Sequence, residues 1–363
     1  MYKIIIGILK DKTTQGEIIV MKRWKTIVLC LVFAIFTGLQ AILAANVFVT
    51  DMDLTSNIDM KGAITTRGDF ELSFDGGHKY QGKLMLQYLN ADIEGNTLPA
   101  LSFYGAQASV KNIFQFLDLT YWTGYYGILG EGKHYKGHLY HRNSGFEYNG
   151  YFPVQGTGLV FSTDYYDKYE AQFFVYQRYG GSTVNSFDLN FSLNSDPLYL
   201  KLLTGASENA WRAATQFQFL GEFTDLYLTI GDPSIALGNT VTFDDFYFLL
   251  EEWFKMNQWN LILSVFSRPE VHYNYLERDY LETDEKNDID FNFDLNYEPE
   301  TSFFSGGSEL NIQTNSNESF GVYLSPYISI FTSGVIWKVK IDFNLLSENR
   351  DFITAYLNVK ASF

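Results

Sequence analysis

The chain ends on FITAYLNVKASF, residues 352–363, and this stretch carries the clearest structural signal in the sequence. Every second position is apolar, from Ile353 through Leu357 to Phe363, and the positions between them are mostly polar. Because successive side chains of a strand point to opposite faces, this two-residue period predicts a β-strand with two unlike faces. Chain termini are usually frayed, so a strict period up to the last residue indicates a strand that a sheet holds in place.

The same alternation recurs after residue 66, with turn residues between the runs and no long segment of helical period. In residues 289–297, Ile, Phe, Leu and Tyr alternate with Asp and Asn, and residues 187–193 and 335–345 repeat this pattern. Each run predicts a strand of an antiparallel sheet. Further runs are expected near residues 70–75, 80–93, 100–110, 112–122, 136–148, 157–165, 168–179, 197–205, 211–221, 223–231, 242–255, 258–268, 302–314 and 318–331.

A cleavable signal peptide is predicted at Met21–Ala45. It has a basic start at residues 22–25, an apolar core at residues 27–36, and small residues at Ala44 and Ala45. A retained transmembrane helix over residues 27–45 is the alternative. Residues 1–20 precede this start and are interpreted as an upstream extension, with a genuine longer leader as the alternative.

Charge and cysteine content exclude several classes of function. The six bases and two acids before residue 46 leave 20 Lys and Arg against 40 Asp and Glu in the rest of the chain. Such an acidic surface repels phosphates, so no nucleic-acid partner is expected. The single cysteine, Cys30, lies in the leader, so no disulfide framework or thiolate metal site is predicted.

An exported chain of alternating strands fits either a sandwich or a membrane barrel, and three features favour the barrel. The interleaved residues are charged or amide in run after run, and no helices cover the strands. Aromatic residues make up 18% of the chain and gather near predicted strand ends, as at residues 121–126, 165–166, Trp253 and Trp259, like the girdles at membrane interfaces. Only helices and closed barrels satisfy their backbone polar groups in a bilayer, so the strands predict a closed barrel.

Together, the leader and the last strand resemble those of bacterial outer-membrane β-barrel proteins, which end on an aromatic residue, here Phe363. The resemblance is architectural and matches no named subfamily. It implies a Gram-negative-type envelope, outer-membrane lipid as surroundings, and recognition of Phe363 by the barrel-assembly machinery. We therefore predict an all-β, transmembrane, antiparallel up-and-down barrel of about 16 strands, within a range of 14–18. It spans residues 67–363, and residues 46–66 form an interior segment or an extra strand.

Candidate site residues follow from the face that would line the lumen. The pore-lining candidates are Asp290, Asp294, Glu309, Lys338, Lys340 and Asp342. A basic cluster in the acidic chain is a candidate for a constriction, with a solvated loop as the alternative: Lys133, His134, Lys136, His138, His141 and Arg142. The overlapping stretch GILGEGK, residues 127–133, matches part of a phosphate-binding loop but is followed by His134 instead of Ser or Thr, so it is interpreted as a glycine-rich turn.

These features predict a porin-like outer-membrane channel for passive diffusion of small hydrophilic solutes, with no enzymatic activity, cofactor or metal. On the expected register, ten acids and six bases face the lumen, which predicts a weak cation preference. The acids are Asp69, Glu71, Asp75, Glu170, Asp188, Asp225, Asp290, Asp294, Glu309 and Asp342; the bases are Lys83, Arg178, Arg212, Lys338, Lys340 and Lys360. The alternatives are a transporter for apolar ligands, like the fatty-acid transporters, and a surface adhesin. The oligomeric state stays open.

Overall fold

The structure is a computed structural model of the chain. The described residues are 47–58, 64–76, 79–90, 100–134, 150–165, 168–178, 184–207, 210–236, 241–242, 245–267, 289–299, 303–314, 320–346 and 352–362. The predicted signal peptide, residues 1–20 and Phe363 therefore lie outside the described residues. The leader and the assembly role of Phe363 stay predictions.

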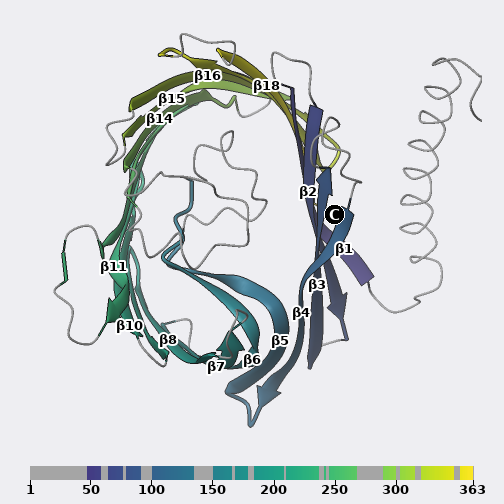
Figure 1. Cartoon of the computed structure of the whole chain (residues 1–363), viewed down its shortest axis with the longest axis vertical. Coiled ribbons are helices and arrows are strands. Elements are labelled where there is room, and N and C mark those ends of the chain that lie inside the picture. The colour runs from purple at the N-terminus through teal and green to yellow at the C-terminus, as the bar shows by residue number, and fades with distance from the viewer. Residues whose placement is uncertain are drawn as a thin grey trace, which may run out of the picture. The chain divides into compact units, whose positions relative to one another are not determined.

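The described strands form one antiparallel sheet of 18 strands that closes on itself. Each strand pairs with its neighbour in sequence, and β1 pairs with β18, so the predicted up-and-down barrel is confirmed (Figure 1). The estimate of 16 strands is wrong, although 18 lies at the edge of the predicted range. The estimate erred because it assumed 18 to 20 residues for each strand with its turn, whereas some turns are as short as Asp196–Pro197, between β8 and β9.

The strands are 9 to 14 residues long, which suits tilted strands crossing a bilayer. Their bounds are β1 Val47–Ile58, β2 Ile64–Asp75, β3 Tyr80–Asn90, β4 Ala100–Ile113, β5 Leu117–Leu129, β6 Phe152–Tyr165, β7 Tyr169–Arg178, β8 Val184–Ser195, β9 Leu198–Ser207, β10 Ala210–Leu220, β11 Thr224–Ala236, β12 Tyr247–Met256, β13 Trp259–Ser267, β14 Ile289–Tyr297, β15 Phe304–Thr314, β16 Phe320–Thr332, β17 Val335–Asn344 and β18 Ile353–Ser362.

Both ends of the described chain meet at the seam of the barrel. The segment 46–66, for which the sequence left two possibilities, contains β1 and the first residues of β2. The terminal alternation forms β18, where Tyr356 pairs with Asn57 of β1 on one side and with Lys340 of β17 on the other. The expected run 136–148 lies outside the described residues.

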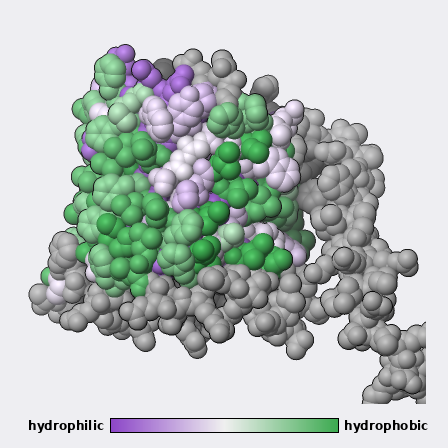
Figure 2. Space-filling view, turned by 90° about the horizontal axis from the view of Figure 1, so that it is seen from above, coloured by the Kyte–Doolittle hydropathy of each residue, from purple (hydrophilic) through white to green (hydrophobic). Residues whose placement is uncertain are grey.

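Alternation divides each strand into an outer and an inner set. On β14, the outer residues Phe291, Phe293 and Leu295 are exposed, whereas Asp290, an inner residue of the same strand, is 1% exposed. Figure 2 shows one face of the molecule, on which hydrophobic residues cover most of the coloured surface and hydrophilic ones gather toward the upper edge. Such an apolar band matches the surface that lipid chains contact in a membrane barrel.

No helix among the described residues is both long enough and apolar enough to cross a membrane.

Candidate pore constriction

The end of β5 and the start of β6 leave the wall and bend into the interior of the barrel (Figure 1). The bend coincides with a register shift between Tyr125 and Gly127, where β5 gains a residue relative to β6. Such bulges bend a strand and increase its local twist. We refer to the described part of this excursion, residues 125–134 and 150–156, as the inward hairpin.

The inward hairpin is fixed by an apolar core that lies inside the barrel. Trp122 contacts Phe174 edge-to-face at 6.1 Å between ring centroids, and Tyr151 contacts Tyr247 at 5.8 Å. Edge-to-face rings add to the stabilisation that their buried area provides. The other members come from β5, β6 and the wall strands β7, β9, β10, β12 and β13: Leu129, Phe152, Val154, Val160, Tyr176, Leu203, Ala214, Leu249 and Phe266.

This core corrects two expectations about aromatic and inward residues. Trp122 is fully buried and Tyr125 is 8% exposed, so they belong to the interior and not to an interface girdle, whereas Tyr121 and Trp259 are exposed. Parts of the inner set of β7 and β12 are apolar, as Phe174, Tyr247 and Leu249 show, because these residues face the hairpin and not water. An interior filled in this way narrows the lumen on one side.

A buried ion pair between two wall strands, β8 and β10, lies against the hairpin. Arg212 donates to both carboxylate oxygens of Asp188, at 2.5 and 2.8 Å, and the Tyr176 hydroxyl donates to the same carboxylate at 2.7 Å. The guanidinium also lies over the ring of Phe152 on the hairpin, 4.2 Å from its centroid. Both charged side chains are 1% exposed, so the two-pronged geometry offsets the cost of removing them from water.

Glu251 of β12 holds the hairpin where β5 ends. The backbone N–H groups of Lys133 and His134 donate to its carboxylate at 2.7 and 3.1 Å, and Glu251 is fully buried. Gly132 permits this approach, since a Cβ there would lie 2.6 Å from the carboxylate oxygens. The His134 ring packs against Trp253 at 4.7 Å between centroids. We call these contacts the Glu251 clasp.

The Lys133 ammonium reaches a neighbouring acid on the wall. Its Nζ lies 3.8 Å from Asp225 and 5.1 Å from the centroid of the Trp253 ring, and Lys255 contacts the same carboxylate at 2.7 Å. Lys133 and His134 of the predicted basic cluster therefore lie against the inner wall. The remaining members lie outside the described residues: Lys136, His138, His141 and Arg142.

The glycine-rich stretch, residues 127–133, forms a turn, and its residues have structural roles that differ from one another. Gly130 has a φ of 68°, in the left-handed region that favours glycine. The next carbonyl, of Glu131, accepts a hydrogen bond from Gln216 of β10 at 2.8 Å. With Gly132 at the clasp, these features account for the spacing that resembles a phosphate-binding loop.

A second polar group lies on the inner face of β14–β17. Glu309 contacts Lys338 at 3.4 Å and Lys340 by a short hydrogen bond, and the Tyr327 hydroxyl donates to Asp294 at 2.8 Å. Asp342 accepts a hydrogen bond from Ser325 at 2.5 Å. The structure thus brings five of the six pore-lining candidates together. We use the name charged wall for these five residues together with Ser325 and Tyr327.

Asp290, the sixth pore-lining candidate, stands apart from this group. It is 1% exposed, and its strand partners are Phe266 of β13 and Gln313 of β15. Asp290 therefore belongs to the border between the apolar core and the charged wall.

Sequence reasoning missed several inward charges. Glu251 was not singled out because residues 247–255 carry an acid on each face, and Glu252 occupies the outer set. Lys201 was missed because its strand, LYLKLL, is apolar on both faces. The sequence does contain one signal for the buried interior. Nearly continuous apolar runs, such as QFFVY at residues 172–176, indicate strands that are buried on both faces.

The inner face carries acids and bases in small compensated groups. Besides the expected residues, the inner face of the described strands carries Asp51, Asp53, Asp118, Glu131, Asp164 and Glu251 among the acids and Lys133, Lys201 and Lys255 among the bases. Among the described residues, no cluster of three or more His, Cys, Asp or Glu could hold a metal ion.

Comparison with known proteins gives similarity of fold. The chain is similar to OccAB3 of Acinetobacter baumannii, with a TM-score of 0.53 at 9% identity, covering 87% of this chain and 98% of that one. It is also similar to the outer membrane protein OpdK of Pseudomonas aeruginosa, with a TM-score of 0.50 at 12% identity, covering 88% and 99%. A second structure of OpdK, solved with vanillate, gives 0.51 at 12% identity, covering 86% and 98%.

No protein-family model and no curated protein matches the sequence. The closed sheet and the apolar outer face define the class of fold: the chain is an antiparallel β-barrel of the type seen in the outer membrane protein OpdK.

Proposed function

We propose that the protein is a diffusion channel of the bacterial outer membrane, through which small hydrophilic solutes pass without a chemical reaction. The observation that carries the proposal is the division of the closed sheet into an apolar outer face and a charged inner face. A barrel of this size is wider than the eight-stranded barrels that side chains fill, so it can hold water beside the inward hairpin.

The inward hairpin is the constriction in this proposal. It is held on one side of the lumen by the apolar core and the Glu251 clasp, and the charged wall lines the other side. A solute would therefore pass between the inward hairpin, which packs on the apolar core, and the charged wall. Protein charges act strongly at such a site because low-dielectric walls focus their field.

We further propose a weak preference for cations. The excess of acids over bases in the expected set, and among the further inward charges, supports this sign. The preference is weak because Asp188, Asp225, Glu309 and Glu71 each contact a base.

Single-channel recording in a planar bilayer tests the proposal. In potassium chloride we expect steady current steps whose size is proportional to the voltage. Across a salt gradient we expect a reversal potential whose sign shows that cations permeate more readily than anions. Silence would reject the channel and favour a transporter for apolar ligands or an adhesin, the two alternatives that the sequence leaves open. A clear anion preference would reject only the proposed selectivity.

A further inference from the structure

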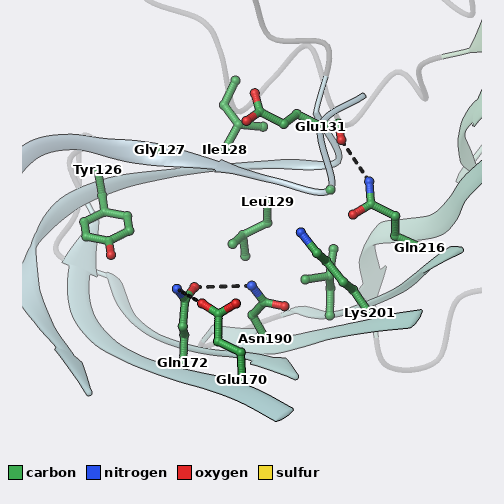
Figure 3. A pocket seen from close by; sticks show the side chains of 12 residues that line it. Tyr126, Gly127, Ile128, Leu129, Glu131, Glu170, Gln172, Asn190, Lys201 and Gln216 are labelled. Atoms are coloured by element: carbon green, nitrogen blue, oxygen red, sulfur yellow. Dashed lines mark hydrogen bonds between the residues drawn. The ribbon is translucent and has the colours of Figure 1, made fainter. Parts of the chain in front are cut away.

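A recess opens between the inward hairpin and the wall strands β7–β10 (Figure 3). Its empty volume is about 620 Å³, counting the space that opens to the lumen. Tyr126, Leu129 and Glu131 line it from the hairpin side, and Glu170, Gln172, Asn190, Lys201 and Gln216 line it from the wall.

The wall of the recess separates one cation from one anion. Glu170 of β7 pairs with Ser192 of β8, which pairs with Lys201 of β9, so one strand lies between the two charges. At about 4.8 Å between neighbouring strands, the two Cα atoms are roughly 10 Å apart. Figure 3 shows the Lys201 ammonium and the Glu170 carboxylate on opposite sides of Asn190, and both face the recess. No salt bridge joins them within the described structure.

Several polar groups in this wall lack partners. The Lys201 ammonium makes no hydrogen bond or ion pair with any of the residues that the structure describes. Asn190 donates to Gln172 at 3.2 Å, but its Oδ1 is buried without a partner, and so is the hydroxyl of Ser192. Of these groups, Asn190 and Lys201 line the recess, in neighbouring rows of the wall. Buried polar groups are nearly always paired, so the unpartnered Asn190 oxygen beside an unpaired ammonium indicates a site for a polar ligand.

We propose that the recess is a binding subsite for a small zwitterionic solute, which it holds during passage through the proposed channel. The anionic group of the solute would pair with Lys201, and its ammonium group would pair with Glu170, with the Asn190 carbonyl oxygen as a further acceptor. Two charge-assisted contacts at fixed separation favour a solute that carries both charges over one that carries either alone.

The arrangement of charges distinguishes this ligand class from a simple anion or cation. A lone anion would meet the Glu170 carboxylate within the same recess, and a lone cation would meet Lys201. Gln172 supports this division, because it donates to Glu170 at 2.8 Å and so orients the carboxylate without neutralising it. The inference rests on the proposed channel function, because the solute must reach the recess through the lumen.

The test uses three probes of equal carbon number: alanine as the zwitterion, propionate as the anion and propylammonium as the cation. The measurement is the concentration at which each probe halves the single-channel current of the full-length protein in potassium chloride. We expect alanine to act at a concentration about tenfold or more below that of either single-charge probe, since only alanine makes both charge-assisted contacts.

Two variants and two matched controls locate the site. Lys201→Gln and Glu170→Gln should each raise the half-blocking concentration of alanine by about tenfold. Lys83→Gln and Glu71→Gln remove the same charges from the inner face of β2 and β3, outside the recess, and should leave it unchanged. Current steps in each variant show that its barrel has formed.

Four outcomes would overturn the inference. If propionate blocks as well as alanine and Glu170→Gln has no effect, the recess is a simple anion site. If the controls act as strongly as the recess variants, the effect is general to the lumen. Regular current steps without block by any probe would reject the subsite and leave the channel standing, whereas a silent parent protein would reject both.

Discussion

The two sides of the barrel interior differ in what their inner faces contact. On β7–β13, inward side chains such as Phe174 and Leu249 pack against the inward hairpin in a closed apolar core. On β14–β17, inward side chains such as Asp294 and Lys338 form the charged wall. The same two-residue period builds both sides, so the period determines the barrel and the residue types on its inner face determine what fills it.

The Arg212–Asp188 pair beside the hairpin is buried on both sides of its contact, which the charged wall does not match. Arg212 and Asp188 are each 1% exposed, whereas Glu309 in the charged wall is 15% exposed and its partners Lys340 and Lys338 are 1% and 28% exposed. A buried pair is expensive to break because one charge stays behind without water. We therefore expect the hairpin side to govern stability and the charged wall to govern conduction.

The largest effect is expected from breaking the buried pair on the hairpin side. Arg212→Met leaves Asp188 buried and uncompensated, so we expect the free energy of unfolding to fall by about 3–5 kcal/mol. Denaturant unfolding in detergent micelles, followed by tryptophan fluorescence, measures it. Lys83→Met breaks the partly exposed pair with Glu71 and should cost no more than about 1 kcal/mol. Equal losses would erase the proposed difference between the two kinds of pair.

A smaller effect is expected from a cavity in the apolar core. Leu203 is 2% exposed inside the barrel, and its neighbour Leu202 is 46% exposed on the outer face. Leu203→Ala should lower the free energy of unfolding by about 2–4 kcal/mol, because the packed hairpin cannot fill the space. Leu202→Ala should cost under about 1 kcal/mol, since lipid or detergent occupies the gap. The same unfolding experiment compares them, and a larger loss for Leu202→Ala would argue against a packed interior.

The smallest effect is expected at the charged wall and at Asp290 on its border. Asp290→Asn with Asp294→Asn removes two inward acids, and we expect the ratio of cation to anion permeability to fall by less than about twofold. Neighbouring charges compensate one another there, so the change should grow as salt is lowered and screening weakens. Reversal potentials across a potassium chloride gradient measure it. A shift as large for Glu252→Gln, on the outer face, would show that the inner charges do not control selectivity.

The sequence predicted the barrel well because alternation is a local signal. Residues 353–362 and 289–297 show the alternation so clearly that the sequence predicts both the strand and its two faces. For β1 the sequence left two possibilities, an interior segment or an extra strand. The charged wall followed from the same rule, because Glu309, Lys338 and Asp342 occupy the polar set of clean runs.

The inward hairpin could not be predicted because it depends on contacts between distant segments. Trp122 and Tyr125 read as interface aromatics until the fold brings them to Phe174 and Tyr104. The clasp joins Lys133 to Glu251 across 118 residues, and no local pattern reports such a pair. Residues 172–176 did hold a signal, since a strand that is apolar on both faces needs a second partner besides lipid.

In the proposed channel, the inward hairpin narrows the lumen because the Glu251 clasp holds it in place. The single-channel conductance of Glu251→Ala measures this narrowing, with Glu252→Ala, which truncates the next residue on the outer face, as the control. Glu251→Ala removes the carboxylate that the N–H groups of Lys133 and His134 contact, and such charge-assisted bonds contribute about 1.5–3 kcal/mol. We expect Glu251→Ala to conduct with larger and noisier steps than the parent protein and Glu252→Ala to match the parent. Identical steps in all three proteins would contradict the claim.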